Sequence, residues 1–335
     1  MKNPLSDSKV VVFFITALII LFPFLTEATN NQFLLSLGTK IIIYAIAVVG
    51  LDLLIGFGGL VSFGHAAFFG VGAYTVGILA HHYSQQTIIP FLPFDWYGTH
   101  QAIVQWPIAI LISATVAYFI GLLSLRTSGV YFIMITLAFA QMLYHFMMSL
   151  PTYNGGDGLN IWDRSDLGFI DLYNETSFFY VSSFFFLIVT ILVKTLSNSR
   201  FGMTLSAGRQ DEVRLTSLGI PIFRYRLIAF SIAGGISGLS GALAANHLEF
   251  VGPGLMHWTR SGEFIVMVVL GGMGSIFGAL PGTLILLGLE ELFIGYTDHW
   301  GLILGPVLIC LVLFAKKGMW GTLTSLMSNW DDFRK

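Results

Sequence analysis

Apolar runs of membrane-spanning length follow one another along almost the whole chain. An α-helix needs roughly 20 apolar residues to cross a bilayer. Hydrophobic residues make up 55% of the 335 residues and charged residues only 10%, against about 25% charged residues in soluble domains. So few charges could not cover the apolar surface of a soluble protein of this size. The sequence therefore predicts an all-α, polytopic integral membrane protein with a single transmembrane domain over residues 1–335. Its ten predicted spans cover residues 10–25, 33–55, 60–80, 102–125, 130–150, 177–193, 227–245, 264–277, 280–295 and 301–315.

Two of these runs have features that a simple span lacks. Lys2 and Lys9 precede the first run, as they would in a signal peptide, but the run is long and the TEATN that follows is a weak cleavage site. We expect a retained first span, with cleavage as the alternative. The eighth run is short and contains GGMGS, so it is either a complete span or a re-entrant or broken helix.

The longest polar insertion, residues 194–226, orients the predicted spans. It holds six of the sixteen Lys and Arg residues, and loops rich in these residues stay in the cytoplasm. With ten spans and a cytoplasmic amino terminus, only Lys40, Arg164 and Arg260 lie outside or near the outer boundary, which leaves thirteen of the sixteen inside. Both termini are then cytoplasmic.

The same insertion has the pattern of a short helix. Charges alternate in GRQDEVR, apolar residues recur at Val213, Leu215 and Leu218, and Gly219 to Pro221 form a stop signal. We expect this helix to lie along the cytoplasmic face and to dock a soluble partner. The alternative is a solvated loop without a partner.

A glycine cluster, GFGG at residues 56–59, interrupts the second and third runs. Each glycine in a helix costs about 1 kcal/mol relative to alanine, and an interruption within the membrane is tolerated where it is buried or lines a watery cavity. We therefore predict a tight turn joining two spans, on a substrate path; a helix hairpin packed on its glycines is the alternative. The candidate path residues are Asp52, Gly56, Phe57, Gly58, Gly59, Phe63, Gly64, His65 and Phe68.

Few ionisable residues fall within the predicted spans. Asp52 precedes the glycine cluster and His65 follows it. Each is either functional or a structural hydrogen-bonding group, since a buried polar group needs a partner in both cases. Glu263 opens the eighth run, whereas His145, Glu290 and Glu291 stand near span ends and are expected at the membrane interface.

Sequence motifs for catalysis, metals and nucleotides are absent. The chain has a single cysteine, Cys310, and no His or Cys pair at metal-ligand spacing, so we expect no metal site. No nucleophile and base stand at the spacing of an enzyme motif. There is also no G-x-x-x-x-G-K-[ST] loop for a nucleotide phosphate. We expect this chain to bind no cofactor and any ATP to be bound by another subunit.

Three stretches carry a family resemblance, in the same order over nearly the whole chain from about residue 40. They are LDLLIGFGGLVSFGHAAFFGVGAY (51–74), SGVYFIMITLAFAQMLYHF with NGGDGL (128–146 and 154–159), and RFGMTLSAGRQDEVRLTSLGIPIFRYRLIAFSIAGGISGLSGALAA (200–245) followed by LGGMGSIFGALPG (270–282). Together they resemble the LivM-type permease subunits of ABC importers for branched-chain amino acids.

The resemblance implies partners and roles. A second permease subunit would form a heterodimer with this chain in the bacterial cytoplasmic membrane, with two cytoplasmic ATPase subunits that bind ATP and magnesium and a periplasmic binding protein. Arg209, Asp211, Glu212 and Gly219 correspond to the segment that contacts the ATPase. Two departures stand out: Asp52 replaces a neutral residue such as Asn, and the R-x-N-E spacing reads Arg209 to Glu212 as RQDE.

Three other functions remain open at this point. Relatives of the family also carry other amino acids, or urea and short amides. An ion-coupled secondary transporter would use an intramembrane carboxylate or histidine, for which Asp52 and His65 qualify. An intramembrane transferase or hydrolase using His65 or His145 is disfavoured by the missing motif.

Overall fold

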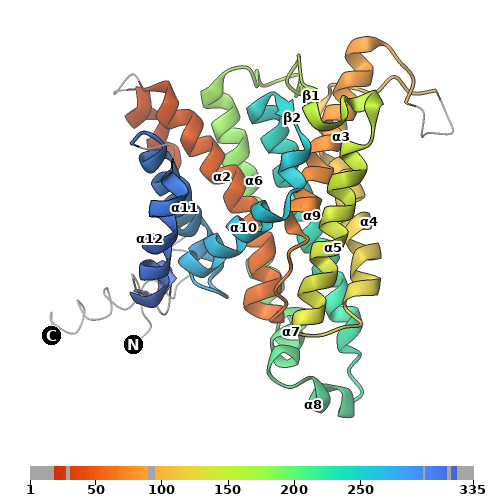
Figure 1. Ribbon diagram of the computed structural model, residues 1–335, viewed down its shortest axis with the longest axis vertical. Helices are drawn as coiled ribbons and strands as arrows, with labels where there is room; N and C mark the ends of the chain where they lie inside the picture. Colours follow the sequence, from red (N-terminus) through yellow and green to blue (C-terminus); the bar gives the residue numbers. More distant parts are fainter. Residues whose placement is uncertain (1–18, 28–30, 90–94, 297–298, 315–317, 323–335) are drawn as a thin grey trace.

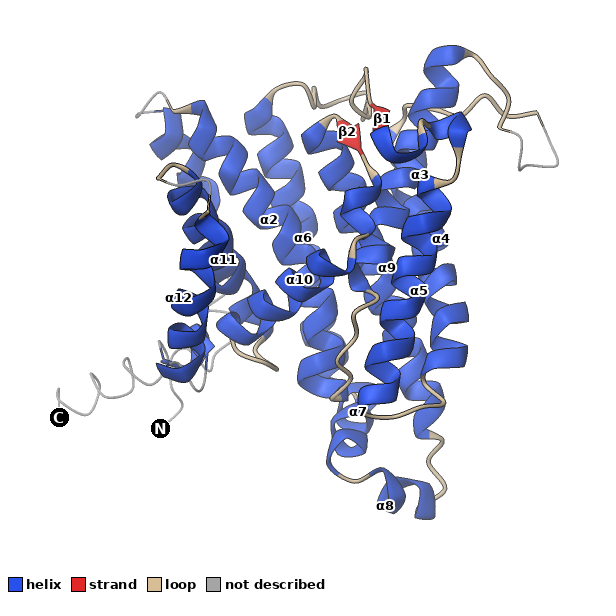
Figure 2. Cartoon of the chain, in the orientation of Figure 1, coloured by secondary structure: helices blue, strands red, loops and turns tan. Residues whose placement is uncertain are grey.

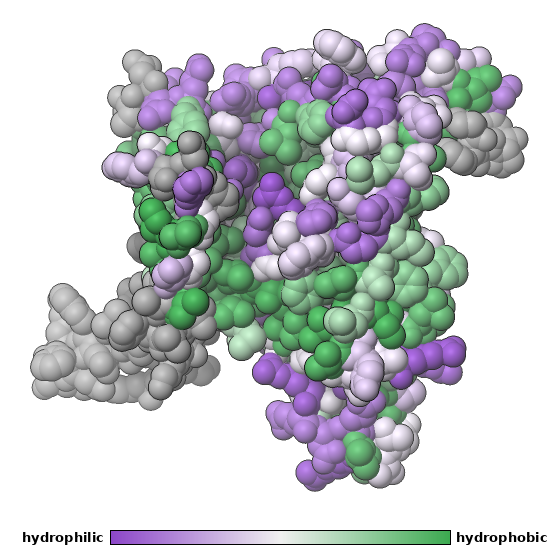
Figure 3. Space-filling model, viewed as in Figure 1, coloured by the Kyte–Doolittle hydropathy of each residue, from purple (hydrophilic) through white to green (hydrophobic). Residues whose placement is uncertain are grey.

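The computed structural model describes residues 19–27, 31–89, 95–296, 299–314 and 318–322. It is a bundle of long helices with a band of apolar side chains around its middle and polar side chains at both ends (Figures 1 and 3). The α-helices are α2 (Gln32–Asp52), α3 (His65–Gln85), α4 (Ala102–Ser124), α5 (Val130–Met148), α6 (Glu175–Asn198), α7 (Arg200–Gln210), α8 (Glu212–Ser217), α9 (Ile222–Leu248), α10 (Trp258–Gly271), α11 (Ala279–Ile294) and α12 (Trp300–Phe314). The all-α membrane fold predicted from the sequence is confirmed.

Six helices of the described chain are long and apolar enough to cross a membrane. They are α2 with the π-helix η2 (Leu53–Gly58), then α4, α5, α6, α9, and α11 with the 3-10 turn η6 (Ile276–Gly278). The predicted run at 60–80 is the helix α3, which starts five residues later. Most of the predicted first span, residues 10–18, lies outside the described residues. The structure describes residues 19–27, which are helical.

The centre of the bundle is formed by α2 and α9. The apolar window of α2 and η2 is 94% buried and that of α9 is 83% buried, against 17% for α5. Glycines allow α3 and α9 to approach, because a Cβ on Gly72 would overlap the backbone of Gly238 and one on Gly241 would overlap the carbonyl of Phe69. Close backbone contact of this kind is how helices pack in lipid.

The two ends of the bundle differ (Figure 2). At one end, called here the sheet end, β1 (Leu159–Asn160) pairs antiparallel with β2 (Phe250–Val251). The short 3-10 turns η3 (Pro151–Tyr153), η4 (Gly155–Asp157) and η5 (Pro253–Met256) adjoin these strands in the sequence. At the other end, called the α8 end, α7 and α8 extend beyond the rest of the bundle (Figure 1).

Two helices, α3 and α10, start inside the bundle after a break in the α-helical structure, and the second of these breaks includes β2 at the sheet end (Figure 1). The first break, residues 59–64, separates η2 from α3, and the second break, residues 249–257, separates α9 from α10. The predicted tight turn at GFGG is displaced, because Gly56 to Gly58 belong to η2 and the chain leaves the helix at Gly59, whose φ is 66°. The π-helical bonds carry the helix past the first glycines, and the left-handed conformation that ends it favours glycine.

The eighth predicted run is the helix α10, which occupies residues 258–271 rather than 264–277. Its 14 residues span about 21 Å at 1.5 Å per residue, less than the roughly 30 Å of a bilayer core. Figure 1 shows α10 beginning at the middle height of the bundle. It is a half-helix that starts inside the apolar band.

Candidate functional site

The first break is held in place by hydroxyl groups from two other helices. The backbone N–H of Phe63 donates to Thr136 Oγ1 of α5 at 3.2 Å. Ser261 Oγ of α10 donates to the carbonyl of Phe63 at 2.6 Å and accepts from the N–H of Ala66 at 2.9 Å. These side chains satisfy backbone groups that a continuous helix would have paired, as the apolar surroundings require.

The residues that begin α3 are fully buried. Gly64 precedes the helix, and its carbonyl accepts from Ala67 and Phe68. The His65 ring lies against Phe68, with ring centroids 5.8 Å apart, and both side chains have no exposed surface. Within the described chain neither ring nitrogen of His65 has a hydrogen-bond partner. Of the predicted path residues, Phe57 and Phe63 are half-buried and Gly59 is exposed, whereas His65 and Phe68 belong to the interior in this conformation.

Asp52 connects two glycine segments that are far apart in the sequence. Its Oδ1 accepts from the N–H of Gly274 at 2.7 Å, and its side chain is buried. Gly56 lies against the same turn, since a Cβ there would overlap the backbone of Gly274 and come within 2.6 Å of Asp52 Oδ1. The carboxylate therefore has a structural hydrogen bond that ties η2 to the GGMGS turn after α10.

Arg209 of α7 also reaches the glycine cluster. Its guanidinium donates from Nη1 to the carbonyl of Gly56, and its aliphatic part lies beside Gly59, where a Cβ would come within 2.8 Å of Arg209 Cγ. Leu205, which is fully buried, packs beside Gly58. Residues predicted for the path and for coupling, 153 positions apart, thus form one contact.

The predicted cytoplasmic helix is two helices joined at a cap. Asp211 accepts from the N–H of Arg214 at 3.0 Å and begins α8. Glu212 pairs with Arg226 at 2.7 Å, and Gly219, with φ of 78°, follows the end of α8. Val213 and Leu218 are 77% and 69% exposed at the tip of the molecule. Exposed apolar side chains beside charges are typical of a docking surface.

A group of charges lies beside the second break. Arg260 and Glu263, both on α10, pair at 2.8 Å, and Lys40 of α2 pairs with Glu291 of α11 at 3.2 Å. Glu290 lies within electrostatic range of both pairs. Figure 3 shows hydrophilic side chains over the start of α10, at the middle height of the molecule and above an apolar region. Sequence reasoning missed this group, because it placed Arg260 near the outer boundary and the glutamates at span ends.

Comparison with known proteins decides the class of this protein. The family described as branched-chain amino acid transport system / permease component matches residues 33–313. The chain belongs to this family. It is 27% identical to the high-affinity branched-chain amino acid transport system permease protein LivM of Salmonella typhimurium, over 84% of this chain and 69% of that protein. It is equally 27% identical to LivM of Escherichia coli, over 91% of this chain and 74% of that protein.

A more distant relative belongs to the same kind of system. The permease protein BraD of Pseudomonas aeruginosa is 24% identical over 83% of this chain and 91% of its own length. No solved structure matches the chain. Family membership makes the chain a multi-pass membrane permease, so its site must be sought where a solute can cross the apolar band.

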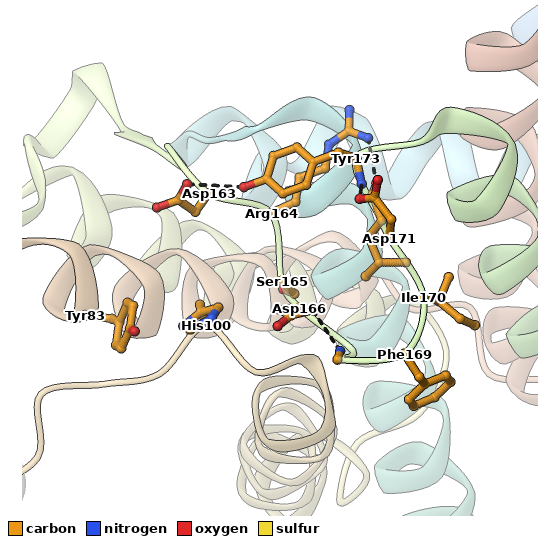
Figure 4. Close-up of a pocket in the computed structure, with 12 residues that line it drawn as sticks. Tyr83, His100, Asp163, Arg164, Ser165, Asp166, Phe169, Ile170, Asp171 and Tyr173 are labelled. Carbon is orange, nitrogen blue, oxygen red and sulfur yellow. Dashed lines mark hydrogen bonds between the residues drawn. The ribbon is translucent and has the colours of Figure 1, made fainter.

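A hollow at the sheet end of this permease does not meet that requirement (Figure 4). It has a volume of about 610 Å³ and is lined mainly by residues 163–173. Its polar groups are largely engaged: Asp166 accepts from Gly168 at 2.7 Å and Asp171 accepts from Tyr173 at 2.9 Å within that segment, and Arg164 pairs with Glu249 outside it at 2.8 Å. These bonds order the connecting segment at the end of the bundle.

Proposed function

We propose that this chain is the permease subunit of an ATP-binding-cassette importer that moves branched-chain or other apolar amino acids into the cytoplasm by alternating access. The observation that carries the proposal is the family match over residues 33–313. Its working partners would be a second permease subunit, two cytoplasmic ATPase subunits that bind ATP and magnesium, and an external binding protein. A permease for urea or short amides is the alternative within the family.

In this proposal the α8 end faces the cytoplasm. The segment 194–226, which includes α7 and α8, carries six cationic side chains, and cationic loops are retained on that side. The sheet end then faces outward, toward the binding protein, and both termini are cytoplasmic in the bacterial inner membrane. The exposed Val213 and Leu218 of α8 belong to the surface on which an ATPase subunit docks.

The contacts of Arg209 supply a route from that surface to the first break. A displacement of α7 moves the Arg209 guanidinium and the buried Leu205, and both act directly on η2. Asp52 passes the movement to the turn that holds Gly274. Since π-helices and extended segments lack a full α-helical ladder, η2 and residues 59–64 are where the chain can rearrange while the buried α2 and α9 stay fixed. A movement driven by ATP hydrolysis would thus be transmitted to the membrane interior through side chains of this chain.

Ion coupling through Asp52 or His65 is disfavoured on the same geometry. Asp52 accepts a hydrogen bond from the backbone of Gly274, and His65 is fully buried against the ring of Phe68. A coupling site must exchange its ion with water in each cycle. Neither side chain is exposed for that exchange.

Reconstitution tests the proposed function. The complete complex is placed in proteoliposomes with ATP inside and binding protein outside, and uptake of labelled leucine is measured. We expect uptake that requires both ATP and the binding protein and that survives collapse of the proton gradient. Uptake driven by an ion gradient without ATP would refute the proposal, and urea taken up in place of leucine would select the alternative substrate.

A further inference from the structure

The charges beside the second break are unusual for their position. Arg260 and Glu263 lie on a half-helix that begins at the middle height of the bundle (Figure 1), and their side chains are 34% and 33% exposed. An ionised side chain facing hydrocarbon is costly, so such residues face a water-filled cavity or a partner group. Partial exposure at this depth is what side chains that face water, a polar solute or a partner group would show.

Not every charged group near α10 has an ion-pair partner within the described chain. Lys40 and Glu291 form an ion pair. Glu290, the preceding residue of α11, interacts electrostatically with Arg260 and Glu263 but forms no hydrogen bond or ion pair with any other residue of the described chain. Among the described residues, Arg260 donates only from Nη1, to Glu263. One carboxylate and most donors of one guanidinium are thus left for a ligand.

We propose that Arg260 and Glu290 form a transient site for the zwitterionic end of an amino acid. Arg260 receives the substrate carboxylate, for which the planar guanidinium fork is suited. Glu290 receives the ammonium group. The inference rests on the proposed import function and adds the recognition chemistry to it: the substrate must carry both charges.

The remaining features of the site favour release of the substrate over tight binding. Glu263 already pairs with Arg260 at 2.8 Å, so the substrate carboxylate competes with an existing partner and is readily released. The amino terminus of α10 adds a partial positive charge near Arg260. The segment 59–64 lies next to α10 through the Ser261 hydrogen bonds, and its half-buried Phe63 offers an apolar contact to the substrate side chain.

The first experiment compares two neighbouring carboxylates. Glu290→Gln and its matched control Glu291→Gln are reconstituted with wild-type partners, and leucine uptake is measured with saturating binding protein. We expect Glu290→Gln to lower uptake by about tenfold or more, the equivalent of one hydrogen bond to a charged group. Glu291→Gln should stay within about threefold, since a partly exposed ion pair contributes little. Equal uptake by the two variants would overturn the proposal.

The second experiment tests whether leucine uptake requires a positive charge at position 260 and whether water-soluble reagents reach that position. Arg260→Cys is made in a Cys310→Ser background and treated with a cationic, a neutral or an anionic methanethiosulfonate reagent. We expect the cationic adduct alone to restore leucine uptake, by about tenfold over the untreated variant. The Cys310→Ser complex with unaltered Arg260 controls for reaction at the partner subunits. No modification by any reagent, or equal rescue by the neutral one, would refute a water-reachable cation at this position.

These tests remain separate from the proposed function. ATP-dependent leucine uptake by the wild-type complex establishes that function before any variant is compared. If the wild type imports leucine and both variants behave as their controls, the import function stands and the Arg260 and Glu290 site is wrong. If the wild type imports no leucine, the import function fails, and the thiol reaction still reports whether water reaches position 260.

Discussion

The two breaks each lead into a helix that starts inside the bundle, yet they carry different side chains. At the first break, hydroxyl groups of Thr136 and Ser261 satisfy the backbone, and the glycines before it contact Arg209 of α7. At the second break, the chain leads directly to the charged pair of Arg260 and Glu263. The first break is held by hydrogen bonds to its backbone, and the second leads to ionised side chains. In the proposed importer the two breaks serve the two separate needs of alternating access: a part that moves and a part that recognises a zwitterion.

Among the contacts around the first break, we expect the loss of the Arg209 contact to have the largest effect on transport. Arg209→Glu removes the guanidinium donor and puts a carboxylate beside the Gly56 carbonyl. We expect leucine transported per ATP hydrolysed to fall by about tenfold or more, since a hydrogen bond to a charged group is worth about 1.5–3 kcal/mol. Uptake and ATPase activity are measured on the same proteoliposomes.

Arg224→Glu is the matched control, because Arg224 is exposed on the same polar segment and makes no ion pair within the described chain. The affinity of the binding protein for leucine should be the same in both variants. If Arg209→Glu and Arg224→Glu transport equally well per ATP, the link between α7 and η2 plays no part in coupling.

A glycine-to-alanine pair compares η2, which leads into the first break, with the second break. Gly56→Ala places a methyl group into the backbone of Gly274, whereas Gly254→Ala in the second break has no atom within 4 Å. We expect Gly56→Ala to destabilise the complex by at least about 1–3 kcal/mol, the usual range for an overpacked core, and Gly254→Ala to change it by less than about 0.5 kcal/mol. Thermal unfolding in detergent measures both. A stable Gly56→Ala complex would show that η2 adjusts to the added methyl group and that its contact with the turn is loose.

Sequence reasoning located the first break, whereas for the eighth run it allowed a broken helix but placed the irregularity at GGMGS and not before α10. Consecutive glycines in an apolar run are a local signal, so GFGG marked the interruption, but its position depended on a π-helix that no residue pattern reveals. The second break gave a weaker signal, because the first turn of α10, WTRSGE, is polar and was assigned to a loop. A search for apolar runs that are long enough to cross the membrane does not detect a half-helix that starts at mid-depth.

The contacts between distant segments could not be predicted at all from local patterns. The resemblance assigns Arg209 to the segment that contacts an ATPase, but it does not indicate that the guanidinium donates to the carbonyl of Gly56. The hydrogen bond from Gly274 to Asp52 joins residues 222 positions apart. Each depends on how α7, η2 and the turn after α10 pack together. Charge count and glycine content predicted the membrane fold, whereas the site depends on tertiary geometry.

Asp52 gives the smallest expected effect and separates a structural carboxylate from an ion-coupling one. Asp52→Asn keeps an oxygen that can accept from the Gly274 N–H, so leucine uptake and thermal stability should stay close to wild type. Asp52→Leu removes the acceptor of a part-buried hydrogen bond, whose loss costs about 0.5–1.5 kcal/mol, and should lower the unfolding temperature of the complex. If Asp52 instead carried a coupling proton, uptake would cease in Asp52→Asn, because the amide of Asn cannot take up that proton. Normal ATP-driven uptake by Asp52→Asn, together with a destabilised Asp52→Leu, would assign the carboxylate to the hydrogen bond that ties η2 to the GGMGS turn.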